Sequence, residues 1–211
     1  MPGRYSDTVS QSVSWGRPPA ERADAARNRV LLLAAARRML AEQGPDRLTM
    51  DGLAERAGLG KGTVFRRFGT RAGIFQALLD DDEEALQQRI LSGPPPLGPG
   101  APPVERLVAY GRARIRFLIE HREIARAALG TTRPTPARPR TPMSQIHIRV
   151  LLGQVGLVGL DLNMLSVQLT AALDSPMLLY VSSDDLSEGA DELERRIGQA
   201  WQDLVERVCR P

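Results

Sequence analysis

A basic segment at residues 61–68, KGTVFRRF, has side chains suited to binding a polyanion. It contains Lys61, Arg66 and Arg67 and no acidic residue. Lys and Arg side chains donate hydrogen bonds to phosphate oxygens and to O6 and N7 of guanine. The methyl group of Thr63 suits the methyl group of thymine. The chemistry predicted for this segment is therefore contact with a nucleic acid.

Two short helices must position this segment, and the preceding residues carry their signals. Thr49 suits the cap of a helix that ends about eight residues later, where Gly58 provides the turn. Val64 and Phe68 are expected to face inward and anchor the second helix. With the small Ala54 where the helices cross, this spacing is typical of a helix-turn-helix. That motif lays its second helix in the major groove of DNA.

The remainder of the chain predicts an all-α architecture of about nine helices, because strand signals are nearly absent. Besides the helix-turn-helix, the helical segments are 21–43, 71–90, 104–129 with a break near His121, 143–155, 162–181 and 188–207. Proline-rich segments at 92–103 and 131–142 are expected to be loops. We divide the chain into a disordered tail (1–20), a DNA-binding domain (21–70) and a helical regulatory and dimerisation domain (71–211). The acidic run 80–84 is expected to be a solvated helix face.

Composition restricts the class of protein. Residues 1–75 contain 13 basic and 7 acidic residues, whereas the remainder contains 15 and 18. A basic N-terminal part favours a nucleic-acid partner at that end. The single cysteine, Cys209, excludes an internal disulfide framework, and no apolar run suggests a membrane span or a signal peptide, so we expect a cytoplasmic protein with no membrane partner. With His121 and His147 as its only histidines and no metal-ligand spacing, the chain predicts no enzyme and no cofactor.

These motifs resemble the tetracycline-repressor (TetR) family of bacterial transcription factors. The resemblance rests on TMDGLA at 49–54, AGL at 57–59, KGTVFRRF at 61–68 and TR at 70–71. It implies three DNA-binding helices, a linking fourth helix, and a regulatory domain of five or six helices. It further implies a homodimer built from the last two helices, and release of double-stranded DNA when a small molecule binds. The chain departs from the family pattern at Gly60, Phe65, Arg67, Gly69 and Arg71.

The residues of the predicted DNA contact divide into two sets. Phosphate contacts fix register and base contacts carry sequence choice. For phosphate we expect Thr49, Arg67 and Arg71, and for the bases Lys61, Thr63, Phe65 and Arg66. Thr49 also suits a purely structural cap, and Phe65 a purely structural core residue.

The regulatory half carries weaker signals. Candidate residues of a ligand pocket, expected to take a hydrophobic effector, are Tyr110, Arg114, Phe117, His121, Met143, His147, Met164, Gln168 and Asp174. The stripe Leu193, Ile197, Trp201 and Leu204 on the last helix, with a face of 162–181, is the expected dimer interface, and the alternative is that this stripe is internal core. A second reading of the whole chain is a ligand-binding helical oligomer whose DNA module has decayed, since a tyrosine and a serine common in the family are absent. The sequence favours no operator position, so activation in place of repression is also compatible with it.

Overall fold

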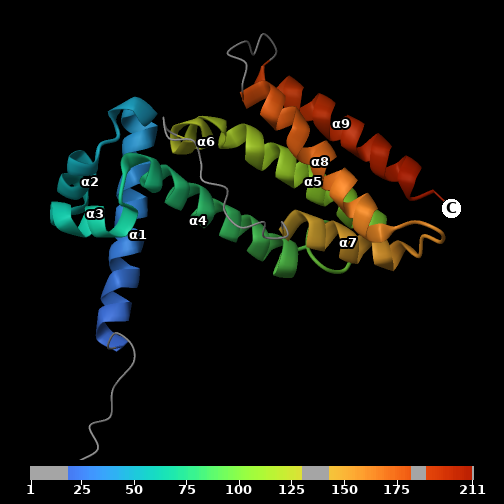
Figure 1. Cartoon of the computed structure of the whole chain (residues 1–211), viewed down its shortest axis with the longest axis horizontal. Coiled ribbons are helices and arrows are strands. Elements are labelled where there is room, and N and C mark those ends of the chain that lie inside the picture. The colour runs from blue at the N-terminus through green and yellow to red at the C-terminus, as the bar shows by residue number, and fades with distance from the viewer. Residues whose placement is uncertain (1–18, 130–142, 182–188, 211) are drawn as a thin grey trace, which may run out of the picture.

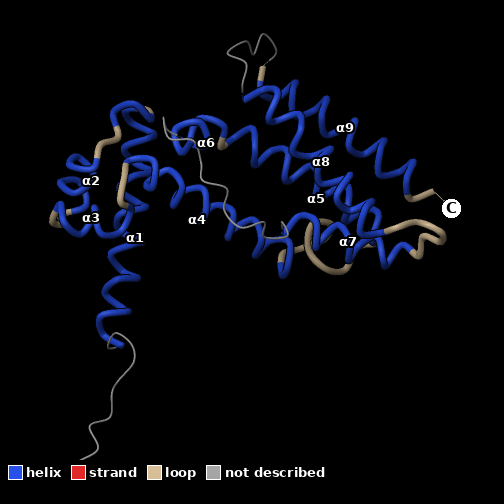
Figure 2. Tube along the Cα trace, viewed as in Figure 1, coloured by secondary structure: helices blue, strands red, loops and turns tan. Residues whose placement is uncertain are grey.

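The computed structural model describes residues 19–129, 143–181 and 189–210, and these residues form an all-α protein with no strand among them (Figures 1 and 2). The α-helices are α1 (Pro19–Gln43), α2 (Met50–Ala57), α3 (Lys61–Phe68), α4 (Arg71–Ser92), α5 (Pro103–Glu120), α6 (Arg122–Leu129), α7 (Met143–Val155), α8 (Leu162–Val181) and α9 (Ala190–Val208), and a short 3-10 helix, η1 (Pro45–Arg47), precedes α2. The all-α prediction is confirmed. The predicted loop 131–142 and nearly all of the predicted disordered tail lie outside the described residues.

The caps and glycines expected from the sequence set the ends of the N-terminal helices. The Thr49 hydroxyl accepts a hydrogen bond from the Gly52 amide at 3.0 Å and thereby caps α2. Gly58 ends α2 in the left-handed conformation, with φ of 65°, which favours glycine. Gly73 lets α4 approach α3 closely, because a Cβ atom there would lie 2.0 Å from the Phe68 carbonyl oxygen.

Two hydrophobic cores lie at the two ends of α4, and Figure 1 shows this helix running from one group of helices to the other. Ile74, Phe75 and Leu78 belong to the core formed with α1, α2 and α3. Leu86 and Ile90 belong to the second core, formed with α5, α7, α8 and α9. Helix α4 therefore connects the N-terminal module rigidly to the C-terminal bundle.

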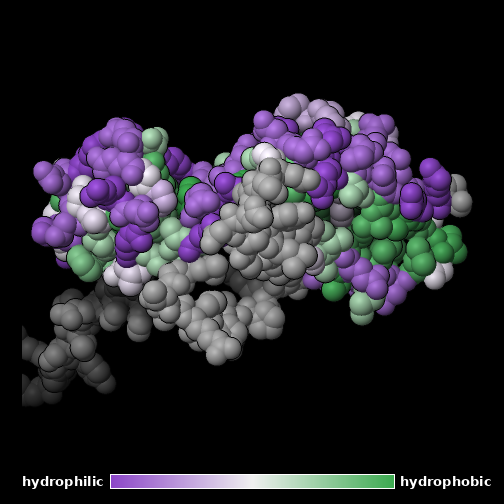
Figure 3. Space-filling model, turned by 90° about the horizontal axis from the view of Figure 1, so that it is seen from above, coloured by the Kyte–Doolittle hydropathy of each residue, from purple (hydrophilic) through white to green (hydrophobic). Residues whose placement is uncertain are grey.

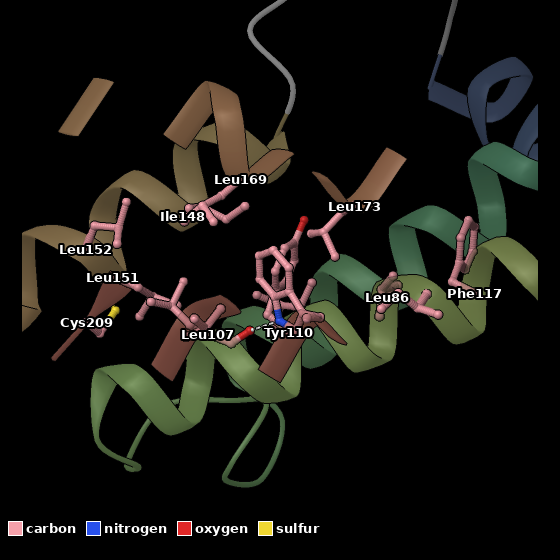
Figure 4. Close-up of a cluster of buried hydrophobic side chains, with 14 of the residues drawn as sticks. Leu86, Leu107, Tyr110, Phe117, Ile148, Leu151, Leu152, Leu169, Leu173 and Cys209 are labelled. Atoms are coloured by element: carbon pink, nitrogen blue, oxygen red, sulfur yellow. Dashed lines mark hydrogen bonds between the residues drawn. The ribbon is translucent and has the colours of Figure 1, made fainter. Parts of the chain in front are cut away.

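The second core is the interior of the C-terminal bundle. Leu151 and Leu152 of α7, Leu169 and Leu173 of α8, and Tyr110 of α5 converge there, as Figure 4 shows. Since each of these side chains is at most 3% exposed, the bundle has a well-packed interior without help from another chain.

The packing of α9 corrects part of the expected dimer interface. Leu193 and Trp201 are only 2% and 3% exposed, and the Trp201 indole N–H donates to the Leu107 carbonyl of α5 at 3.0 Å. These two side chains are therefore internal core and are out of reach of a second chain. Ile197 is partly buried against the same core, and Leu204 is 36% exposed.

The acidic run on α4 also differs from the expected solvated face. Asp81 and Asp82 both form ion pairs with Arg37 of α1, and Asp81 additionally pairs with Arg29. Asp82 also lies 3.0 Å from His121, which ends α5. The run therefore joins α1 to the α5–α6 corner. The sequence analysis did not predict these ion pairs, because an acidic run in one helix carries no information about which basic residues face it.

No helix among residues 19–129, 143–181 and 189–210 is long and apolar enough to cross a lipid bilayer.

Candidate nucleic-acid interface

The two helices α2 and α3 form the helix-turn-helix that the sequence predicts. Three residues, 58–60, separate them. Val64, with no exposed surface, anchors α3 in the core next to Leu53 and Ala54 of α2. Phe68 packs against the same core. With one face held in this way, the opposite face of α3 is available to a partner.

The outer face of α3 is basic. Lys61, Arg66 and Arg67 are exposed there, and Phe65 is 52% exposed. An aromatic side chain with half of its surface in solvent suits packing against a base or a sugar better than a place in the core. The α3 N-terminus has no side-chain cap, because its capping residue is Gly60. The first backbone N–H groups of α3 therefore have no side-chain acceptor, and such an open helix N-terminus suits an anion such as a phosphate.

Three of the predicted base-reading side chains, Lys61, Thr63 and Arg66, have partners within the module. Lys61 Nζ lies 2.7 Å from Asp51 Oδ2 of α2, and both side chains are more than 60% exposed. Arg66 Nη2 lies 3.4 Å from the hydroxyl of Thr63. An exposed ion pair of this kind contributes only about 0–1 kcal/mol, so a phosphate or a base edge can displace Asp51 at little cost.

Of the predicted phosphate ligands, Thr49 and Arg67 are exposed. The Thr49 side-chain oxygen accepts a hydrogen bond from the Gly52 amide. The Thr49 O–H group therefore remains free to donate to a phosphate oxygen.

The structure gives Arg71 another role and corrects its assignment to phosphate. Its guanidinium donates to the carbonyls of Leu48 and Pro45, at 2.7 and 2.5 Å, and lies over the Phe75 ring. Arg71 thus fastens the η1 segment to α4. The motif alone shows that a cation stands at the start of α4, whereas its direction depends on carbonyls more than 20 residues away.

A groove between α1 and α3 adds residues that the sequence analysis did not select. Asn28 and Arg29 of α1 line this groove together with Thr63, Arg66 and Arg67. Arg29 lies one helical turn before the buried Leu32 and Leu33, and this offset is the only sequence signal that could have placed it beside α3.

The comparisons with known proteins agree with this geometry. Residues 32–78 match the family model described as bacterial regulatory proteins, tetR family. The N-terminal module is therefore a DNA-binding domain of the TetR family, and the chain is a DNA-binding regulator.

Solved structures of TetR proteins share the fold over nearly their whole length. A regulator from Pectobacterium atrosepticum is 21% identical, with a TM-score of 0.58 over 87% of this chain and 94% of that one. NalD from Pseudomonas aeruginosa, the secondary repressor of the MexAB-OprM multidrug efflux pump, is 17% identical, with a TM-score of 0.52 over 84% and 96%. The SmeT–triclosan complex is 17% identical, with a TM-score of 0.51 over 86% and 91%. No curated protein matches the chain.

Seven of the nine predicted ligand-pocket residues fall into three groups. Tyr110, Arg114, Met143 and His147 line one cavity between α4, α5 and α7. Phe117 and His121 line a separate open groove between α4 and α5. Asp174 lies 4.0 Å from Arg114 at the edge of the cavity.

Met164 and Gln168 do not join the predicted pocket. Both are exposed on the outer face of α8, and Met164 is 54% exposed. The buried face of this helix is instead formed by Ser166, Leu169, Thr170 and Leu173. The prediction failed here because α8 is apolar on both faces, so its inner face could not be chosen from the sequence.

Proposed function

We propose that the chain is a transcriptional repressor that binds a palindromic operator as a homodimer and releases it when a small apolar molecule binds. The observation that carries this proposal is the basic, acid-free outer face of α3, held on a helix-turn-helix with an open helix N-terminus. Two such faces, spaced roughly one DNA turn or a multiple apart, read a two-fold operator.

The neighbouring structures support the regulatory part of the proposal by analogy. NalD is described as a repressor, and SmeT was solved with triclosan, a small molecule. We extend the same regulation, repression that a small molecule relieves, to this chain.

A route for release follows from α4, which takes part in both cores. A ligand that fits only when α4 is displaced from α7 would favour a dimer with the wrong spacing of its two α3 helices. The loss of operator affinity then equals the difference in ligand affinity between the two forms, and cannot exceed it.

Fluorescence anisotropy on the duplex upstream of the gene, with a random duplex as control, tests the DNA-binding part. We expect tight, salt-sensitive binding to the upstream duplex. We expect Lys61→Ala and Arg66→Ala each to weaken it by about tenfold or more, because a base contact contributes about 1–3 kcal/mol. Arg207→Ala, which removes an exposed arginine at the end of α9, is the matched control and should bind like the unaltered protein.

The proposal would be contradicted if the Lys61→Ala and Arg66→Ala variants bound a selected operator as tightly as the unaltered protein does. Such a result would instead favour a ligand-binding oligomer with a decayed DNA module. Equal, weak binding of the unaltered protein to both duplexes would call for selection from random sequences before the variants are compared.

A further inference from the structure

An open groove of about 540 Å³ runs between α4 and α5, and we refer to it as the α4–α5 groove. Its floor is apolar, because it is lined by the buried side chains of Leu86 and Phe117, by the small residues Ala109 and Ala113, and by Leu97 of the following loop. Among the described residues, none from α7, α8 or α9 lines this groove. The groove is therefore a surface of α4 and α5 that the described part of the chain leaves uncovered.

Three arginines gather along the α4–α5 groove. Arg89 of α4 and Arg112 and Arg116 of α5 line it, and all three are exposed. The Arg89 guanidinium has no ion pair or hydrogen bond with any residue that the structure describes. Arg112 donates hydrogen bonds to the side-chain oxygens of Gln199 and Gln202, which are uncharged. Two of the three positive charges therefore have no ion-pair partner among the described residues.

The opposite end of the groove is acidic. Glu120, the last residue of α5, lines this end and is exposed. Asp82 lies there too, and its ion pair with α1 balances its charge. Arg116, between the two ends, is paired with Glu194 of α9 at 2.7 Å. The groove thus has a positive end and a weakly negative end.

The open shape of the groove favours a helix over a small molecule. Small ligands are normally held in concave sites that bury most of their surface, whereas Ala85 and the three arginines along this groove are exposed. From Ala109 to Glu120, α5 follows the groove for about three turns, or about 16 Å. An amphipathic helix of similar length can lay its apolar face on such a floor.

The charges of the groove also select the direction of such a helix. Stable helices tend to carry acidic residues in the first turn and basic residues in the last turn, because these charges complement the helix dipole. With its first turns beside Arg89 and Arg112, a helix of this kind brings its acidic side chains to the two arginines and its basic side chains to Glu120. The reverse direction would bring like charges together at both ends.

We propose that the α4–α5 groove is a docking site for an amphipathic helix of another protein, acidic in its first turns and basic in its last turns. A contact of about three turns is smaller than a standard protein–protein interface, so we expect a transient complex with a Kd on the order of 10 µM. Docking here requires neither DNA nor an effector, so it is independent of the proposed repressor function.

Fluorescence anisotropy with two labelled, end-blocked peptides of about 16 residues tests this docking on the full chain. Both peptides have the same composition, with leucines three and four residues apart on one face. The first peptide has glutamates in its first two turns and lysines in its last two, and the second has these charges exchanged. We expect the full chain to bind the first peptide at least about tenfold more tightly, because only this peptide matches the charges at both ends of the groove.

Substitutions in the protein show whether the groove is responsible, because the second peptide also opposes its own helix dipole. Arg89→Ala/Arg112→Ala should bind the first peptide about tenfold more weakly than the unaltered chain, since two charge contacts are lost. Arg38→Ala/Arg207→Ala is the matched control, because it removes the same charge from exposed positions on α1 and α9 that do not line the groove. Circular dichroism shows whether each variant is folded.

The docking assignment is overturned if both peptides bind equally well, or if the groove variant binds the first peptide as tightly as the unaltered chain does. It is also overturned if the control variant loses as much affinity as the groove variant, since the attraction would then come from overall charge. Calorimetry with dodecanoate, an anion with an apolar chain, tests a different occupant. Binding of dodecanoate that needs both arginines, with no binding of either peptide, would assign the groove to a small apolar anion and not to a helix.

Discussion

At the scale of single residues, His147 links the cavity to the pH dependence of stability. Folding lowers its pKa from 6.5 to about 4, chiefly because burial disfavours the charged ring and secondarily because Arg106 is near. Between these two values the unfolded chain binds more protons than the folded one. Stability from this residue is therefore complete above pH 6.5 and is lost as the pH falls towards 4.

Urea unfolding of the unaltered protein and of His147→Gln measures this contribution. Between about pH 7.5 and pH 4.5, we expect the unaltered protein to lose on the order of 1–2 kcal/mol more than the variant. This figure is reduced from the full linkage value because solvent partly screens the ring. Asp174, whose pKa burial raises, contributes with the opposite sign in both proteins and cancels in the comparison. Parallel pH profiles of the two proteins would show that His147 is as easily protonated in the folded chain as in water.

The direction of the Arg71 side chain could not be predicted from the sequence. Arg71 stands where the family resemblance expects a phosphate-binding cation, yet its guanidinium spans to two carbonyls of the η1 segment. Thr49, by contrast, was placed correctly as a cap, because its partner lies three residues away. Local hydrogen bonds follow from spacing along the chain, and distant ones require the fold.

At the scale of elements, the contact between α5 and α9 depends on one glycine. A Cβ atom at Gly111 would lie 1.9 Å from Trp201 Nε1, so any side chain there forces the indole out of its place. Gly111→Ala should destabilise the protein by about 2–4 kcal/mol and break the Trp201–Leu107 hydrogen bond.

Thermal unfolding in a Trp15→Phe background, followed by the fluorescence of Trp201, measures the loss of stability. We also expect the native emission of the Gly111→Ala variant to be shifted to the red, because its indole is displaced from the core. Gly153→Ala in α7 is the matched control, because a Cβ atom there meets no other atom within 4 Å. In a helix interior, Ala is favoured over Gly by about 1 kcal/mol, so the control should unfold at the same temperature or higher. Equal loss of stability in both variants would mean that the glycine backbone, and not the Trp201 contact, is responsible.

Asp82 is the residue through which three elements meet. It pairs with Arg37 of α1 and with His121 at the α5–α6 corner. Asp82→Asn should lower the free energy of unfolding by about 1–2 kcal/mol, because hydrogen bonds to a charged group are lost on both sides. Asp80→Asn is the control, since Asp80 is exposed and, within the described part of the chain, accepts a hydrogen bond from Gln76 of its own helix.

A double-mutant cycle of Asp82→Asn with Arg37→Gln in urea unfolding isolates the ion pair. We expect a coupling energy of about 0.5–1 kcal/mol, because the Arg37 side chain is partly exposed. If the changes in the free energy of unfolding simply add, the Asp82–Arg37 ion pair does not help to hold α1 against α4.

The positions of the helices in the chain could largely be predicted from the sequence, whereas the packing of one helix against another could not. The segments 143–155 and 162–181 coincide with α7 and α8, since continuous apolar composition between loops defines a buried helix. The apolar stripe of α9 correctly indicated a covered face, and the residue at its centre, Trp201, packs on α5 of the same chain. A stripe shows that one face is buried, whereas the identity of the cover depends on how the elements pack.

At the scale of the whole molecule, the burial of the α9 stripe moves the proposed dimer interface to α8. Met164 and Val167 are 54% and 44% exposed on its outer face, with the exposed Ala171 one turn further along. Figure 3 shows an apolar area at the end of the molecule where α7 ends and α8 begins. An exposed apolar surface of this kind marks an interaction site, and a two-fold operator requires a second copy of the same chain.

We therefore expect the double variant Met164→Glu/Val167→Glu to be monomeric at concentrations where the unaltered protein is a dimer, as measured by sedimentation equilibrium. Like charges brought together in an apolar contact should weaken the dimer by about a hundredfold or more. Operator affinity should fall with it, because a single α3 helix contacts only half of the site, while the thermal stability of the chain should change little, since both side chains are exposed. Leu204→Glu on α9 separates the two interfaces. If that substitution alone abolishes the dimer and the α8 variant does not, the interface lies on α9, and the two α3 helices are held apart by a different pair of helices.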